Sequence, residues 1–246
     1  MNAFFKHLWI QFKIDVRERG TLMTYYLVPL IFYFVMGAVF SSVNPLAKQT
    51  LTATMVIFAV TMGAVLGIPV PIVKMREYGV LRAYRVCGIP EWAVLFIQSL
   101  SAFLHLLVVS MIIIVSAPAF FGVDYPQSFP AYLLCLFVLL FASISVGLLI
   151  GVTARNQSVA TMLSQSVFLP TVLLSGIMFP TFMLPQPLRI LGYLLPATYI
   201  MQSFSGFVFR LSTDIDAVLS LLIATGIGIV ASIFTAIKFR KVEKSL

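Results

Sequence analysis

The chain has 246 residues, of which 61% are hydrophobic and only 10% are charged. A soluble domain needs about a quarter of its residues charged, so this composition excludes a large soluble domain and predicts several membrane spans of roughly 20 apolar residues each. The net charge of +8 comes from short basic clusters between apolar segments rather than from one basic face, which argues for membrane lipid and against nucleic acid as a partner.

The first twenty residues predict an amphipathic helix that lies along the inner leaflet of the membrane. Aromatic and aliphatic side chains recur at helical spacing, while basic side chains take the remaining faces. The apolar positions are Phe5, Leu8, Trp9, Phe12 and Val16. A solvated basic tail is the alternative, but it leaves the aromatic stripe unexplained. Residues 1–20 are therefore expected to form an interfacial helix.

Seven uncharged windows are long enough to cross a bilayer. They are Thr21–Ala47, Gln49–Val73, Trp92–Val123, Tyr125–Ala154, Asn156–Leu188, Ile190–Phe209 and Ala217–Ile237. The window Ile190–Phe209 enters lipid least readily, because it contains Gly192, Pro196 and several polar residues. With the other six windows as spans and both termini in the cytoplasm, thirteen of the sixteen Lys and Arg residues lie inside, against ten if all seven span. The positive-inside rule therefore predicts an all-α integral membrane protein with six spans and an interfacial or re-entrant hairpin after the fifth.

The longest inner loop follows the second span and covers residues 74–91. It mixes four basic residues with two glutamates and predicts a short helix that ends at Gly88 and Pro90. A short helix with both charged and apolar groups at the inner surface suits docking on a cytoplasmic partner. A basic anchor that only sets the topology explains the same composition equally well.

Prolines crowd into the stretch Gly147–Tyr199. Five of the chain's thirteen prolines lie here, at Pro170, Pro180, Pro185, Pro187 and Pro196. A proline in a span leaves backbone carbonyls that lipid cannot satisfy. We therefore expect the fifth helix to break near its outer end and residues 179–209 to fold back as an extracytoplasmic hairpin.

The proposed spans carry no Asp, Glu, Lys or Arg, although ion-driven transporters usually place such groups at depth. His105 is the one histidine in them, and a lone intramembrane histidine is more often a neutral hydrogen-bonding residue than a proton relay. No nucleotide-binding G-x-x-x-x-G-K-[ST], G-x-S-x-G or H-E-x-x-H motif occurs. Cys87 and Cys135 are too few for a disulfide framework or a metal cluster. We expect no catalytic residue, metal or cofactor in this chain.

Two motifs resemble the ABC-2 family, the membrane subunits of ATP-binding-cassette exporters. The sequence REYGVL at residues 76–81 resembles that family's R-E-x-G-x-L signature after the second span. Ser175–Tyr199 is similar to its S-G-x-x-F-P, L-P and L-P-x-T-Y region. The inner loop departs from the family in reading CGIP at residues 87–90, where a Thr-Pro pair is common. The short link 44–48 lacks the large outer domain of some relatives and points towards the compact exporters of drugs, glycans and lipids.

The resemblance implies that residues 1–246 form a single permease domain in the cell membrane. It would pair with a second copy or a homologous permease, and with two cytoplasmic ATPase subunits that bind the ATP. The residues implied in ATPase coupling are Arg76, Glu77, Gly79 and Leu81. Those of the outer gate and hairpin are Gly176, Pro180, Pro185 and Pro196. The expected activity is export of an amphipathic or hydrophobic compound such as a drug, antibiotic or lipid; the alternatives are export of a lipid-linked glycan and a sensor or assembly factor that moves nothing.

Overall fold

The computed structural model describes residues 3–43, 45–126, 128–179 and 181–245, and it shows no strand among them. Six helices of this described part are long and apolar enough to cross a membrane. They are Arg19–Phe40, Thr50–Glu77, Trp92–Phe121, Phe129–Thr153, Gln157–Leu174 and Ala217–Arg240. The prediction of an all-α membrane protein with six spans is therefore confirmed. The fifth span is shorter than its uncharged window, because the helix stops before Ser175 and Gly176.

The first two spans are each built from two α-helices with a π-helical segment between them. The first consists of α2 (Arg19–Leu22), η1 (Met23–Leu27) and α3 (Val28–Val43), and the second of α4 (Pro45–Met62), η2 (Gly63–Gly67) and α5 (Pro69–Glu77). The other spans lie in α7 (Glu91–Phe121), α8 (Phe129–Thr153), α9 (Gln157–Leu174) and α12 (Ala217–Ser245). The remaining helices are α1 (Ala3–Arg17), α6 (Val80–Val86), the 3₁₀ turn η3 (Thr181–Met183), α10 (Gln186–Gly192) and α11 (Pro196–Phe207).

The second span forms the centre of the bundle. Of its most apolar window 72% is buried, against 22% for the first, fifth and sixth spans. Every residue from Leu51 to Val65 is buried, which matches a segment that is apolar or small on all of its faces. The first, fifth and sixth spans therefore leave most of their surface free for lipid or for other protein.

The two π-helical segments touch each other through one aromatic ring. Tyr25 of η1 is 1% exposed and lies against Gly63 and Gly67 of η2. A side chain at either glycine would bring its Cβ within 2.8 Å of this ring, so both positions need glycine for the close approach. A π-turn holds one more residue than an α-turn, and such turns often occur at functional positions.

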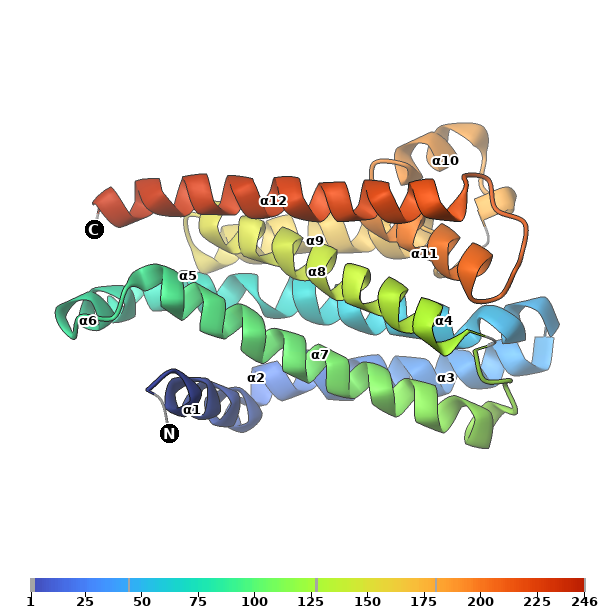
Figure 1. Cartoon of the computed structure of the whole chain (residues 1–246), viewed down its shortest axis with the longest axis horizontal. Helices are drawn as coiled ribbons and strands as arrows, with labels where there is room; N and C mark the ends of the chain where they lie inside the picture. The colour runs from blue at the N-terminus through green and yellow to red at the C-terminus, as the bar shows by residue number, and fades with distance from the viewer. Residues whose placement is uncertain (1–2, 44, 127, 180, 246) are drawn as a thin grey trace.

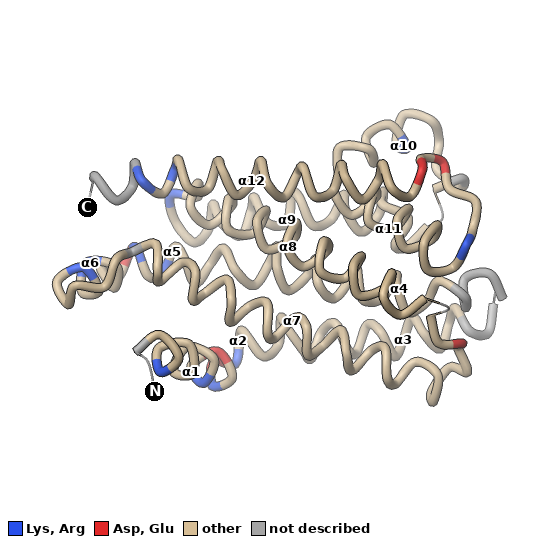
Figure 2. Tube along the Cα trace, viewed as in Figure 1, with Lys and Arg blue, Asp and Glu red and all other residues tan. Residues whose placement is uncertain are grey.

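The bundle has two chemically different ends (Figure 1). One end, here called the α6 end, holds α1, α6 and the C-terminal part of α12; the other, the α10 end, holds α10, α11, the C-terminal end of α7 and the N-terminal end of α8. Most Lys and Arg residues of the described chain lie at the α6 end, as Figure 2 shows. The charge asymmetry that was counted along the sequence is thus an asymmetry between the ends of the bundle. Which end faces the cytoplasm stays a prediction.

Helix α1 does not continue the line of the first span, and its apolar stripe is divided between two environments. Leu8 and Phe12 are partly buried against the protein, whereas Phe5, Trp9 and Val16 are exposed. The exposed side chains are suited to a lipid surface. The placement of α1 in the membrane interface remains a prediction, as does re-entry of the hairpin.

Candidate functional site

The α5–α6 corner begins the predicted coupling loop, and its shape depends on Gly79. Helix α5 ends at Glu77, and α6 starts at Val80 after Gly79 with φ of 69°. This left-handed conformation is strained for a residue with a side chain. No atom outside the neighbouring residues lies within 4 Å of a Cβ built on Gly79, so the space beside the turn is open. The turn thus lets α6 project from the end of the second span.

Arg76 ties the end of the second span to the end of the fourth. Its guanidinium donates hydrogen bonds to the carbonyls of Val152 at 3.3 Å and of Arg155 at 3.2 Å, and also to the carbonyl of Ala154. Carbonyls in the last turn of a helix have no partner within that helix, and a cation there also interacts favourably with the helix dipole. Arg76 therefore acts as a C-terminal cap for α8.

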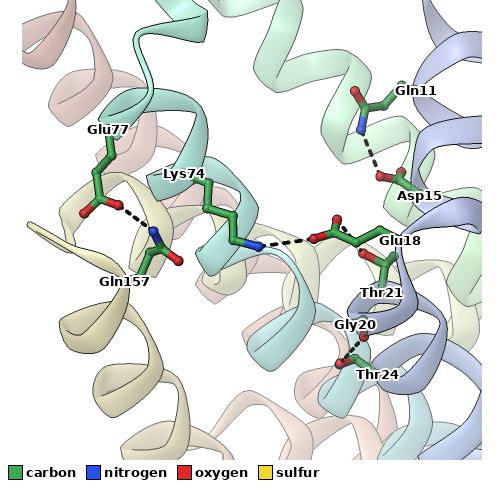
Figure 3. Close-up of polar contacts among 9 residues, drawn as sticks. All are labelled: Gln11, Asp15, Glu18, Gly20, Thr21, Thr24, Lys74, Glu77 and Gln157. Carbon is green, nitrogen blue, oxygen red and sulfur yellow. Dashed lines mark hydrogen bonds and ion pairs between the residues drawn. The ribbon is translucent and has the colours of Figure 1, made fainter.

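Glu77 makes the adjoining contact, with the start of the fifth span. Its Oε2 accepts a hydrogen bond of 2.6 Å from Nε2 of Gln157, which is drawn in Figure 3. Asn156 caps the same helix, because its Oδ1 accepts from the backbone N–H of Val159 at 2.9 Å. Arg76 and Glu77 together hold the α8–α9 link. Gln157 was not predicted as a contact residue, because its signal in the sequence is only its place after a helix-capping asparagine.

The four residues predicted for coupling do not share one surface. Leu81 is 2% exposed and belongs to the core, so it anchors α6 to the bundle. The side chains that α6 and its preceding turn expose include Tyr78 at 75%, Val86 at 88% and Arg82. An apolar and basic surface of this kind is available at the corner to a partner, while Arg76 and Glu77 connect the corner to the spans behind it.

Helix α1 contacts the same corner from the other side. Nζ of Lys74 lies 3.2 Å from Oε1 of Glu18, just after α1 (Figure 3). The ring of His7 stacks on Tyr84 of α6 with centroids 5.2 Å apart. Partial burial lowers the pKa of His7, which favours the neutral ring. No local pattern in the sequence indicates that Glu18 and Lys74 are partners, since 56 residues separate them.

At the α10 end, α9 is followed by a turn and two short helices. Gly176 has φ of 81° and forms the turn after α9. Pro185 precedes α10, and Pro196 is the first residue of α11, where its missing N–H would have no helical partner in any case. Pro180 lies outside the described residues. Neither α10 nor α11 is long enough to cross a bilayer.

Polar contacts join α10 and α11 to each other, to the end of α9 and to the loop before α12. Oγ1 of Thr198 donates to the carbonyl of Gly192 at 2.6 Å, and its distance to Oγ of Ser175 is 3.1 Å. Arg189 of α10 lies 2.7 Å from Asp214 in the loop before α12. Its hydrogen bond to the hydroxyl of Tyr193, together with this carboxylate, raises the pKa of the guanidinium. The result is a compact unit that joins the end of α9 to the start of α12.

Comparison with known proteins gives one family. A model of the ABC-2 type transporter family matches residues 2–209. The "Inner membrane transport permease YhhJ" of Escherichia coli strain K12 is 26% identical over 152 residues, which are 61% of this chain and 41% of that protein. The "Probable multidrug ABC transporter permease YbhS" of the same strain is 31% identical over 83 residues, 33% of this chain and 22% of that protein. The chain thus matches less than half of the length of either relative.

Proposed function

The chain belongs to the ABC-2 type transporter family, and on this basis we propose that it is the permease subunit of an ATP-driven exporter. It lies in the cell membrane with both termini in the cytoplasm, and separate cytoplasmic subunits bind and hydrolyse the ATP. Its cargo is an amphipathic or hydrophobic compound such as a drug, an antibiotic or a lipid. The uncharged spans and the multidrug description of YbhS support this class of cargo.

The α5–α6 corner is the observation that carries the proposal. Its exposed surface around Tyr78, Arg82 and Val86 docks on the ATPase. A displacement of α6 then reaches the fourth and fifth spans through Arg76 and Glu77, whose partners include Val152 at the end of α8 and Gln157 at the start of α9. ATP-driven motion at the surface is in this way transmitted to the spans without any Asp, Glu, Lys or Arg at their centre.

A second permease copy, or a homologue, packs against the fifth span. Gln165 lies at the middle of α9, and its side chain is exposed. An amide that faces hydrocarbon is costly, whereas polar side chains between helices form stabilising hydrogen bonds. The same face also exposes Met162 and Leu169. A protein neighbour or a wet pathway at this face gives the amide the polar environment that lipid lacks.

The helices at the α10 end form the outer gate of the pathway. The segment contains the proposed gate residues Gly176, Pro180, Pro185 and Pro196. Of those that the structure describes, Gly176 lies in the turn after α9, Pro185 precedes α10 and Pro196 begins α11. Because Thr198 contacts both Gly192 within the segment and Ser175 after α9, the gate moves as a unit with the end of α9.

The test of the proposal is reconstitution with an ABC ATPase that co-purifies with the tagged chain. Glu77→Ala removes the contact with Gln157 but leaves the exposed α6 surface, so the complex should assemble and lose cargo-stimulated ATP hydrolysis and export. Gly79→Trp places bulk beside the corner and should block assembly. Gly79→Asn is the matched control, because asparagine tolerates the left-handed backbone. Parent-like hydrolysis and transport by both Glu77→Ala and Gly79→Trp would contradict the coupling role of this corner.

A further inference from the structure

A buried carboxylate joins α1 to the third span. Asp15 is 4% exposed, and its Oδ2 accepts a 2.6 Å hydrogen bond from Oγ of Ser101 in α7. Its Oδ1 accepts a 2.9 Å hydrogen bond from Nε2 of Gln11, one turn earlier on α1 (Figure 3). Asp15 lies outside the predicted spans by sequence, yet it packs on the side of one of them.

His105 lies next to this carboxylate. Its Nε2 is 3.8 Å from Oδ2 of Asp15, and this buried nitrogen has no hydrogen-bond partner among the described residues. Its other nitrogen, Nδ1, is 2.7 Å from the hydroxyl of Tyr26. The ring is stacked on Phe12 of α1 at 4.2 Å and on Tyr25 at 5.5 Å. The imidazole is thus fixed in orientation, with its free nitrogen near Asp15.

Burial of the carboxylate disfavours its charged form. Desolvation raises the pKa of Asp15, the hydrogen bonds from Ser101 and Gln11 oppose this shift, and the nearby charge of Glu18 adds to it. The other titratable groups that face the site are His105 of α7 and Tyr25 and Tyr26 of η1. A proton taken up here neutralises a buried negative charge.

We propose that Asp15 and His105 share a bound proton, and that this proton strengthens the docking of α1 on the third span. The proton comes from the surrounding water and forms a bond to Oδ2 of Asp15, which donates it to Nε2 of His105; no other bond changes. The gap of 3.8 Å must close by about 1 Å to reach hydrogen-bond distance. When α1 swings away from α7, the carboxyl becomes solvated and releases the proton.

The direction of the pH dependence follows from linkage. The docked state holds the proton more tightly than the undocked state, so docking is favoured at low pH and weakens as the pH rises through the raised pKa of Asp15. Since α1 also contacts the α5–α6 corner through Glu18 and His7, its docking affects the position of that corner. The proposal concerns the docking of α1 and does not depend on the proposed transport function.

A cross-link between α1 and α7 reports docking directly. The rings of Phe4 and Phe96 lie 6.1 Å apart, away from the proton site, so a short bifunctional thiol reagent should bridge cysteines at these two positions when α1 is docked. The background carries Cys87→Ser and Cys135→Ala, and the full chain is treated with the reagent in membrane vesicles between pH 4 and 8.5. At each pH the rate is divided by that of the same protein with Asp15→Asn, a neutral isostere, which cancels the pH dependence of the thiol reaction.

The rate ratio should be highest at low pH and should fall as the pH rises. The total fall is about tenfold for each unit by which the pKa of Asp15 in the docked protein exceeds its pKa in the undocked protein. Two further variants shift the midpoint of this fall in opposite directions. His105→Phe keeps the aromatic stack but removes the proton acceptor, so the midpoint moves to lower pH. Ser101→Ala removes a donor to the carboxylate, so the midpoint moves to higher pH.

Each variant therefore tests a separate half of the proposal. A ratio that stays flat across the range refutes a proton linked to docking. A midpoint in His105→Phe that is unchanged or moves to higher pH refutes the shared proton. If His105→Phe does not accumulate in the membrane, the ratio of the parent and the midpoint of Ser101→Ala still decide whether Asp15 is the linked group.

Discussion

Removal of the Arg76 guanidinium should loosen the α6 end of the bundle. Arg76→Met keeps most of the length and apolar volume of the side chain but leaves the carbonyls of Val152, Ala154 and Arg155 without this donor. Arg76→Lys keeps the charge, but one ammonium cannot reproduce the planar fork that reaches several carbonyls.

The magnitude follows from the number and exposure of these contacts. A hydrogen bond to a charged group contributes about 1.5–3 kcal/mol, but the carbonyls at the end of α8 regain water once the partly exposed Arg76 is replaced. We therefore expect a net loss of about 2 kcal/mol for the three contacts together rather than their full sum. For a chain of this size, 1 kcal/mol corresponds to about 2–4 °C in Tm, so Arg76→Met should lower Tm by about 4–8 °C.

The assay is thermal unfolding in detergent, followed by the fraction of protein that remains monodisperse. Arg82→Met is the matched control, because Arg82 is exposed on α6 and its replacement should change Tm by no more than about 1 °C. Arg76→Lys should lie between the control and Arg76→Met. Equal Tm values for Arg76→Met and Arg82→Met would show that the contacts with α8 do not stabilise the bundle.

Three further predictions concern the α10 end and the topology. Gly192→Ala should lower Tm by several degrees, because the new Cβ would lie 2.7 Å from a backbone carbonyl of α9, whereas Gly226→Ala, with nothing within 4 Å, should not. Reversing either charge of the Arg189–Asp214 pair should lower Tm, and the double reversal should restore most of the loss; failure to restore it would argue against a direct interaction. The exposed Cys87 should react only with thiol reagents that cross the membrane, and Asp214→Cys in a cysteine-free protein should react from outside; labelling of Cys87 by an impermeant reagent in intact cells would reject the proposed orientation.

The spans could be predicted from the sequence because their signal is local. A run of apolar residues between charges is visible in any one window, and five of the six helices follow their windows closely. The exception is the window Asn156–Leu188, which contained no charge to mark its end. Its helix stops at Leu174, where a turn with a left-handed glycine follows, so backbone conformation rather than polarity sets the boundary.

The polar contacts of the site could not be predicted because they join distant segments. Arg76 was identified by its motif, but nothing nearby in sequence indicated that it caps α8, 76 residues later in the chain. The predicted interfacial helix, residues 1–20, includes Asp15, and its position outside the uncharged windows predicts a place at the membrane surface. In the structure it faces the protein, since α1 packs with one polar side against the third span. A residue's distance from a hydrophobic window therefore does not decide whether it is solvated.

The π-turn in the second span changes the direction in which all later side chains of that span point around the helix axis. Successive residues of an α-helix are about 100° apart around the axis, so one additional residue in η2 turns the rest of the span by about that angle. Deleting a single residue between Gly63 and Gly67 would let this segment relax to an α-helix of nearly the same length. The corner would then keep its height, but a different set of side chains would point towards the α8–α9 link. Tyr25 packs against both glycines and so favours the π-helical form of this segment. In this way it sets the direction around the helix axis in which Arg76 and Glu77 point.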